Sequence, residues 1–131
     1  MTALAKDRNT PSRAGDVIVH GVAASTLIYA GSIVCVNATG YAVPGSTSTA
    51  LKAVGRAEEQ VDNSAGANGD VTVEISKGIF NFANAGDVDI TDLEANVYIN
   101  DDQTVSSVST GKSVAGKCVA VDSDGVWVEI K

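Results

Sequence analysis

The hydrophobic positions of this chain fall in short runs that are rich in valine and isoleucine and are separated by Gly, Asn, Asp and Ser. Short apolar runs bounded by such turn-forming residues are typical of antiparallel β structure. Alternation is clearest where Val71, Val73 and Ile75 share one side of an extended segment, and again at residues 126–130. Because side chains on a strand alternate between its two faces, each such strand is expected to have one buried face and one wet face.

The pattern predicts strands at residues 17–20, 27–29, 33–37, 41–43, 52–59, 71–76, 79–82, 97–100, 117–121 and 126–130. Two tight turns are expected, at Asp124-Gly125 and at Thr39-Gly40, since glycine tolerates the positive φ that such turns demand. One short helix is expected at residues 91–96. There Thr91 can cap the first turn, and Glu94, three residues later, can return the hydrogen bond.

Three segments lack this pattern. Residues 45–50 (GSTSTA) and 61–70 (VDNSAGANGD) are small and polar, so we expect flexible loops at the rim of the fold. The leading residues show no periodicity, and fixing about a dozen of them costs roughly 12 to 24 kcal/mol of backbone entropy. The sequence therefore predicts an extended N-terminal arm, residues 1–14, that orders on binding, and a β-rich domain, residues 15–131.

Length and composition sharpen the fold class. A chain of 131 residues suffices for one domain with a single core, and folding at this size buries about two-thirds of its surface. Hydrophobic residues make up 44% of the chain but aromatic residues only 5%, so the interior must be built from aliphatic side chains. We expect a mainly β protein: a single small antiparallel β-barrel or β-sandwich with one short helix and the extended arm.

The distribution of charge also separates the N-terminal arm from the rest of the chain. Residues 1–13 hold Lys6, Asp7, Arg8 and Arg13, a net of +2, which leaves −9 for the remainder of a total of −7. An acidic body repels phosphate backbones, and the few aromatic residues offer no platform for stacking bases, so nucleic acid is not expected as a partner. No apolar run approaches the roughly 18 residues of a membrane span and no export signal is recognisable, so we expect synthesis in the cytosol and no membrane partner.

The residues that usually carry catalysis are sparse. His20 is the single histidine, and no G-x-S-x-G turn presents a serine, so His20 is expected to be a hydrogen-bonded structural residue. Cys35 and Cys118 each lie in an apolar run, and we expect free buried thiols rather than a disulfide or a nucleophile.

Two motifs suggest ligands without completing their patterns. Residues 111–117 (GKSVAGK) have phosphate-loop spacing, but Cys118 replaces the required hydroxyl, and a predicted strand follows where that mechanism needs a helix. Acidic pairs occur near residues 87–89, 101–102 and 122–124, yet none follows the twelve-residue calcium loop. We therefore expect no enzyme activity, no cofactor and no metal.

Trp127 alternates away from Val126 and Val128 and so is expected to face the opposite side of its strand. Two interpretations stay open. Trp127 covers a second apolar layer within the monomer, or it anchors a subunit interface, where tryptophan is favoured for its large contact area.

One family shares this order of segments. The polar arm ends in AGDV, and the further shared motifs are YAGSIV at 29–34, VGRAEE at 54–59, VDNS at 61–64, GD at 69–70, GIF at 78–80, YINDD at 98–102, TV at 104–105 and VWV at 126–128. In this arrangement the chain resembles the capsid decoration, or head cement, proteins of tailed bacteriophages.

The resemblance implies a compact β-barrel or sandwich that trimerises at local three-fold positions of an expanded icosahedral head. It implies a location on the outer capsid surface of the virion, with the major capsid protein as partner and no catalytic residues. On this basis, Trp127 and Tyr98 are expected at the oligomer interface.

We expect the arm to bind the capsid through Leu4, Lys6, Arg8 and Arg13, with the basic side chains meeting acidic groups. Three arms on one trimer gain avidity, because each bound arm raises the local concentration of the next. The competing expectation is a virion-surface adhesion or glycan-binding module that uses residues 45–50 and 61–70 as its contact loops.

Overall fold

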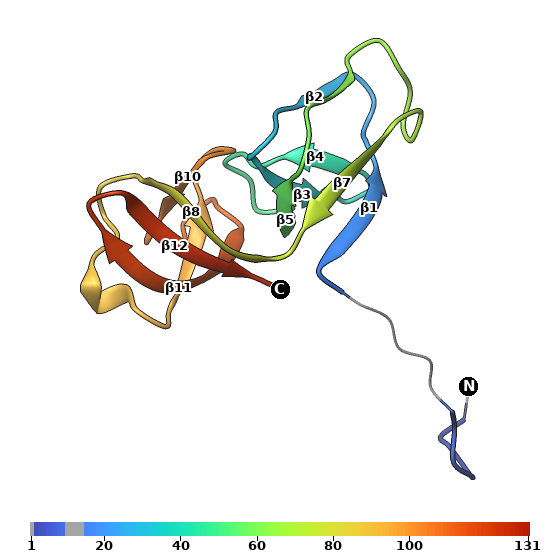
Figure 1. Cartoon of the computed structure of the whole chain (residues 1–131), viewed down its shortest axis with the longest axis horizontal. Coiled ribbons are helices and arrows are strands. Elements are labelled where there is room, and N and C mark those ends of the chain that lie inside the picture. The colour runs from blue at the N-terminus through green and yellow to red at the C-terminus, as the bar shows by residue number, and fades with distance from the viewer. Residues whose placement is uncertain (1, 10–14) are drawn as a thin grey trace.

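A computed structural model describes residues 2–9 and 15–131. The described part is almost entirely β, and its strands form two large units and one small pair (Figure 1). The first unit, here called the open sheet, has five antiparallel strands in the order β1 (Val17–Gly21), β7 (Thr72–Ser76), β5 (Lys52–Ala57), β3 (Ile33–Val36) and β4 (Ala42–Pro44). The small pair consists of β2 (Thr26–Ile28) and β6 (Val61–Asn63).

The second unit is a closed barrel. Its strands run in the order β10 (Thr104–Ser106), β8 (Gly78–Asn84), β12 (Gly125–Ile130), β11 (Val114–Asp122) and β9 (Asn96–Ile99), and β9 pairs with β10 to complete the ring. The prediction of a mainly β protein with a barrel is confirmed. It needs one correction, because β10 pairs with β8 in parallel rather than antiparallel.

The buried residues form two clusters, so the expectation of a single core is wrong. One cluster fills the barrel around Val97, Ile99 and Val128, and the other lies on the far face of the open sheet. Strand β3 contributes to both, because Ile33 and Cys35 belong to the barrel cluster while Val34 between them belongs to the sheet cluster. Alternation along a strand that is covered on both faces explains this division.

Each of the ten predicted strands has a counterpart, with ends shifted by up to three residues. Two further strands, β6 and β10, were not predicted, and β6 occupies the first three residues of the expected loop 61–70. That segment is held by Asn63, whose Nδ2 donates to the carbonyl oxygens of Ala23 and Ala67 at 2.9 Å each. A buried side chain with backbone partners therefore orders a stretch whose composition suggested only a loop.

The expected helix at 91–96 is wrong in its position. The chain forms one 3₁₀ turn, η1 (Ile90–Asp92), and the capping residue is Asp89 rather than Thr91. The Asp89 carboxylate accepts from the Thr91 amide at 2.9 Å, and the Asp92 carboxylate accepts from the Asp89 amide at the same distance. Glu94 cannot continue the turn, because its φ of +67° lies in the left-handed region.

Both predicted turns occur, but the turn between β11 and β12 is formed by residues 123–124, one residue before the expected Asp124-Gly125. Strands β11 and β12 form a hairpin in which Asp122 pairs with Gly125, and Gly125 has a φ of +142°. A Cβ at that position would lie 2.4 Å from the carbonyl oxygen of Phe82, so glycine is required by contact as well as by conformation. Gly40, in the turn between β3 and β4, has a φ of +91°.

Candidate interaction surfaces

The N-terminal arm is exposed wherever the structure describes it. Residues 2–9 form neither strand nor helix, and each is exposed, with Leu4 at 73% of its full accessible surface. Lys6 and Arg8 lie in this segment, whereas Arg13 falls outside the described residues. The arm thus presents to solvent an apolar side chain that is followed by two basic ones.

Trp127 faces outward from the barrel. On β12 the side chains of Val126, Val128 and Ile130 are buried in the barrel cluster, and Trp127 belongs to neither buried cluster. Its indole Nε1 donates to Asp122 Oδ2 at 3.0 Å, and this hydrogen bond is the main cause that lowers the pKa of the Asp122 carboxyl. The indole is therefore oriented by the hairpin that precedes it, with its apolar rim half-buried on the barrel surface.

Tyr98 lies on a different part of the same surface. It sits on β9 opposite Val114, which is 43% exposed, whereas Trp127 pairs with Ala120. Val114 and Ala120 are six residues apart on β11, a separation of about 20 Å at the rise of an extended strand. The structure therefore does not bring the two expected interface residues into one patch.

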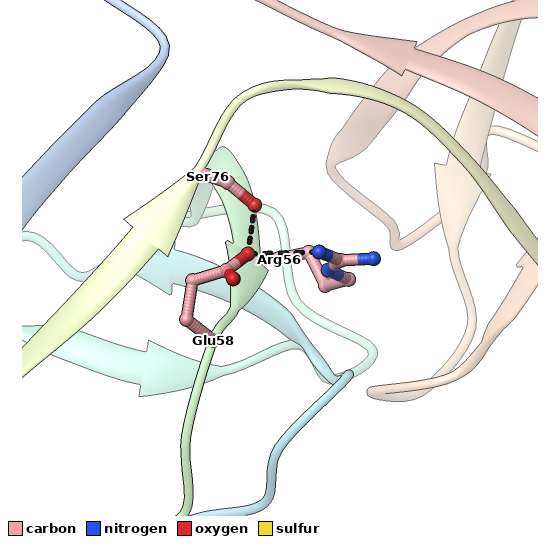
Figure 2. A network of polar contacts seen from close by, with 3 residues as sticks. All are labelled: Arg56, Glu58 and Ser76. Carbon is pink, nitrogen blue, oxygen red and sulfur yellow. Dashed lines mark hydrogen bonds and ion pairs between the residues drawn. The ribbon is translucent and has the colours of Figure 1, made fainter.

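Sequence reasoning missed a polar network of Arg56, Glu58 and Ser76 at β5 and β7 of the open sheet (Figure 2). The Glu58 carboxylate accepts from Arg56 Nη2 at 2.8 Å, and the hydroxyl of Ser76 donates to the same oxygen. The guanidinium of Arg56 also lies 4.5 Å from the ring centroid of Phe80. Because Phe80 packs against the barrel cluster, one arginine contacts the barrel while it pairs with the sheet.

The electrostatics of this network follow from its geometry. The hydrogen bond from Arg56, followed by that from Ser76, lowers the pKa of the Glu58 carboxyl, and burial opposes them. A sequence signal was available, since Arg56 and Glu58 are two residues apart and residues at that spacing on an extended chain face the same way. Their partner Ser76 could not be found in this way, because it pairs with Arg56 only through the sheet register.

Other contacts fix the sheet against the barrel. The Ile33 amide donates to the Asp102 carbonyl at 2.8 Å, so β3 is tied directly to the turn that precedes β10. The Ser113 hydroxyl donates to the Ser48 carbonyl at 2.6 Å and accepts from the Leu51 amide at 3.1 Å. Residues 45–50, expected to form a flexible rim, are thereby attached to the barrel.

The two cysteines share the barrel cluster, and the histidine lies in the open sheet. Cys35 and Cys118 are not joined by a disulfide, and both are buried in the barrel cluster, as predicted. Burial raises the pKa of both thiols, that of Cys35 to about 12. His20 lies on β1 of the open sheet, opposite Val73. The thiols are therefore protonated at neutral pH and shielded from solvent.

The ligand-like motifs take ordinary structural roles. Residues 109–112 form a turn in which the Lys112 amide donates to the Ser109 carbonyl, and β11 follows from Val114. Within residues 2–9 and 15–131, no group of three or more His, Cys, Asp and Glu side chains is placed to hold a metal ion. In the same residues, no helix is long and apolar enough to cross a membrane.

A shallow groove of about 350 Å³ lies where β2 meets the turn before β10. Tyr29, Ala30, Gly31, Ser32, Asp102 and Gln103 line it. The Tyr29 side chain is 56% exposed, so an aromatic ring borders an acid and an amide at an open surface. That combination suits a polar ligand with one apolar face.

Comparison with known proteins adds no relative. No protein-family model, no curated protein and no solved structure matches this chain.

Proposed function

We propose that this chain is a structural virion protein that binds the outside of a tailed-phage capsid and stabilises contacts between neighbouring capsomers. The observation that carries the proposal is the pairing of a rigid β body with an exposed, apolar and basic segment at residues 2–9. The family resemblance of the sequence motifs supports the same role. In this proposal the major capsid protein is the partner and the outer capsid surface is the location.

The body suits a mechanical role because its two units are fastened together. Hydrogen bonds of Ile33 in the open sheet, and of Ser48 and Leu51 in the loop between β4 and β5, reach residues at the barrel, and the Arg56 network adds a further contact. A protein that clamps capsomers must transmit load without separating into parts, and close-packed interiors transmit strain. Trimerisation is part of the proposal, with Trp127 and Tyr98 each contributing a separate contact on the barrel surface.

Removal of the arm tests this function. A variant that lacks residues 2–13 should fold normally but bind undecorated heads at least tenfold more weakly, because three weak arm contacts act together in the trimer. Binding is measured by co-sedimentation with purified heads, and circular dichroism checks the fold. A charge-matched control on the body, Lys52→Gln combined with Lys112→Gln, also removes two positive charges and should bind like the wild type. Undiminished binding by the truncated protein would rule out the arm as the capsid-binding element.

The groove at Tyr29 favours a second candidate function, a virion-surface module that binds glycans. Its aromatic ring beside Asp102 and Gln103 matches the needs of a sugar, which offers an apolar face and several hydroxyls. A glycan array that gives signal with the wild type and none with Tyr29→Ala would support it. An array without signal, together with intact head binding, leaves decoration as the function.

A further inference from the structure

Strand β1 is the unprotected edge of the open sheet. It is the first strand in the sheet order, so β7 is its one neighbour among the described strands, and in Figure 1 it forms the outer border of the sheet. The opposite edge is closed differently. Strand β4 is three residues long, ends in Pro44 and is bridged by Val22 at Ala42.

The free hydrogen-bonding groups of β1 can be assigned from the ladder. The Val22 amide donates to the Val71 carbonyl, and the Lys77 amide donates to the Asp16 carbonyl, at 2.9 and 2.8 Å. Because hydrogen-bonded pairs alternate along an antiparallel ladder, the even-numbered residues of β1 bond to β7. The amide and carbonyl groups of Val17 and Val19 therefore point away from the sheet.

The side chains of β1 do nothing to block a further strand. Exposed edges of natural sheets usually carry a lysine, a proline or a bulge that prevents pairing with another chain. Strand β1 reads VIVHG and has a regular register with β7. Val17 and Val19 are 49% and 61% exposed, so two β-branched side chains stand beside four unused backbone groups.

We propose that β1 pairs with β1 of a second copy of this chain, antiparallel about a two-fold axis at Ile18. In this register Val17 lies opposite Val19 of the second copy, and by the two-fold symmetry Val19 lies opposite Val17 of that copy. The backbone groups then form four hydrogen bonds, and four valines meet on one face of a continuous ten-stranded sheet.

Hydrogen-bonding complementarity within β1 identifies the second copy as the occupant. The proposed register places Asp16 opposite His20 of the other copy, and the axis repeats this contact, so the strand supplies both members of each polar pair. Such residues form the closely spaced, non-hydrogen-bonded pairs of the new ladder. The alternative two-fold register would set Val17 against Gly21. That register is less favourable, because glycine has no side chain to pack against Val17 across the strands.

Mass determination across a concentration series tests the pairing. The contact is small, so we expect a weak dimer that forms toward about 1 mM. Wild-type mass should reach twice that of Val19→Lys if the associating unit is one chain, and at least twice if it is a trimer, because each chain of a trimer carries its own β1 edge. The control Ile79→Lys puts the same charge on the barrel at a site that is 52% exposed, and it should behave like the wild type.

Cross-linking tests the register without relying on a charged substitution. Asp16→Cys combined with His20→Cys places two thiols opposite each other across the axis, about 4.5 Å apart between Cα atoms, which suits a disulfide. Mild oxidation should give a covalent dimer for the double variant and none for Asp16→Cys alone. The native thiols are buried and do not interfere.

Three results would overturn the proposal: a wild-type mass that does not double, a Val19→Lys variant that still doubles, or no cross-link in the double variant. If Val19→Lys and the wild type have the same mass at every concentration, but only the variant fails to bind heads, the edge is assigned to the capsid instead. Loss of head binding on arm deletion alone concerns the proposed function and leaves the β1 pairing intact.

Discussion

The barrel and the open sheet are made from similar residues but complete their hydrogen bonding in different ways. In the barrel each strand has two neighbours, because β9 pairs with β10 and closes the ring. The open sheet ends at β1 and β4, and only the β4 edge is blunted. Closure removes edges altogether, whereas an open sheet keeps a template for another strand. The comparison suggests that the barrel supplies rigidity and the sheet supplies contacts.

The largest expected effect comes from forcing the barrel open. A Cβ at Gly116 would lie 2.3 Å from the carbonyl oxygen of Glu129 and 2.8 Å from a methyl of Val128. Gly116→Val should therefore lower the free energy of unfolding by more than about 4 kcal/mol, the range of severe core disruption. Denaturant unfolding measures the change.

The matched control lies at the start of the sheet edge. A Cβ at Gly15 would meet nothing within 4 Å, so Gly15→Val should change the free energy of unfolding by less than about 0.5 kcal/mol. Equal losses in the two variants would contradict the steric explanation for Gly116.

A smaller effect tests whether the two units unfold together. Ile33→Ala removes packing from the barrel cluster and Val34→Ala removes it from the sheet cluster, although the residues are adjacent on β3. We expect losses of about 3 and 2 kcal/mol, within the range for truncations of buried aliphatic side chains. Each variant should keep one cooperative transition, because the two clusters share a strand. Hydrogen exchange that separates into two independent groups of amides would show that the units are separable.

The smallest effect concerns the Arg56 network at the junction. Glu58 has a lowered pKa when folded, so its contribution to stability is present above the ordinary carboxyl pKa of 4.5 and is lost as the pH falls through the lowered value. The melting temperature of Glu58→Gln should lie slightly below that of the wild type at pH 7, and the gap should close under acid conditions. Glu59→Gln, next in the chain, should show no such gap. A difference that stays constant with pH would remove the ionic explanation.

The strands that sequence reasoning found are those with a clear local signal. Strand β12 alternates between buried valine or isoleucine and outward Trp127 and Glu129, so its two faces could be assigned from the alternation alone. Strands β6 and β10 were missed because each has only three residues, of which two are polar. Both are extended because of distant partners: β2 for β6, and β8 and β9 for β10.

The candidate contacts were predictable to a lesser degree. Alternation placed Trp127 on the outer face of its strand, but it could not show that Tyr98 lies far along the barrel surface, since that depends on the register of β11. The partnership of Arg56 with Ser76 and Phe80 likewise depends on which strands become neighbours. Local pattern therefore gives the orientation of a side chain, and the topology decides which other side chains it meets.

The position of β12 within the barrel has a consequence for synthesis. Strand β12 lies between β8 and β11, so the ring cannot close until the ribosome has made residues 125–130. Until then the apolar side of β3 that carries Ile33 and Cys35 has no barrel to cover it. The nascent chain must pass through a stage with an uncovered hydrophobic surface, the kind of species that aggregates or recruits chaperones.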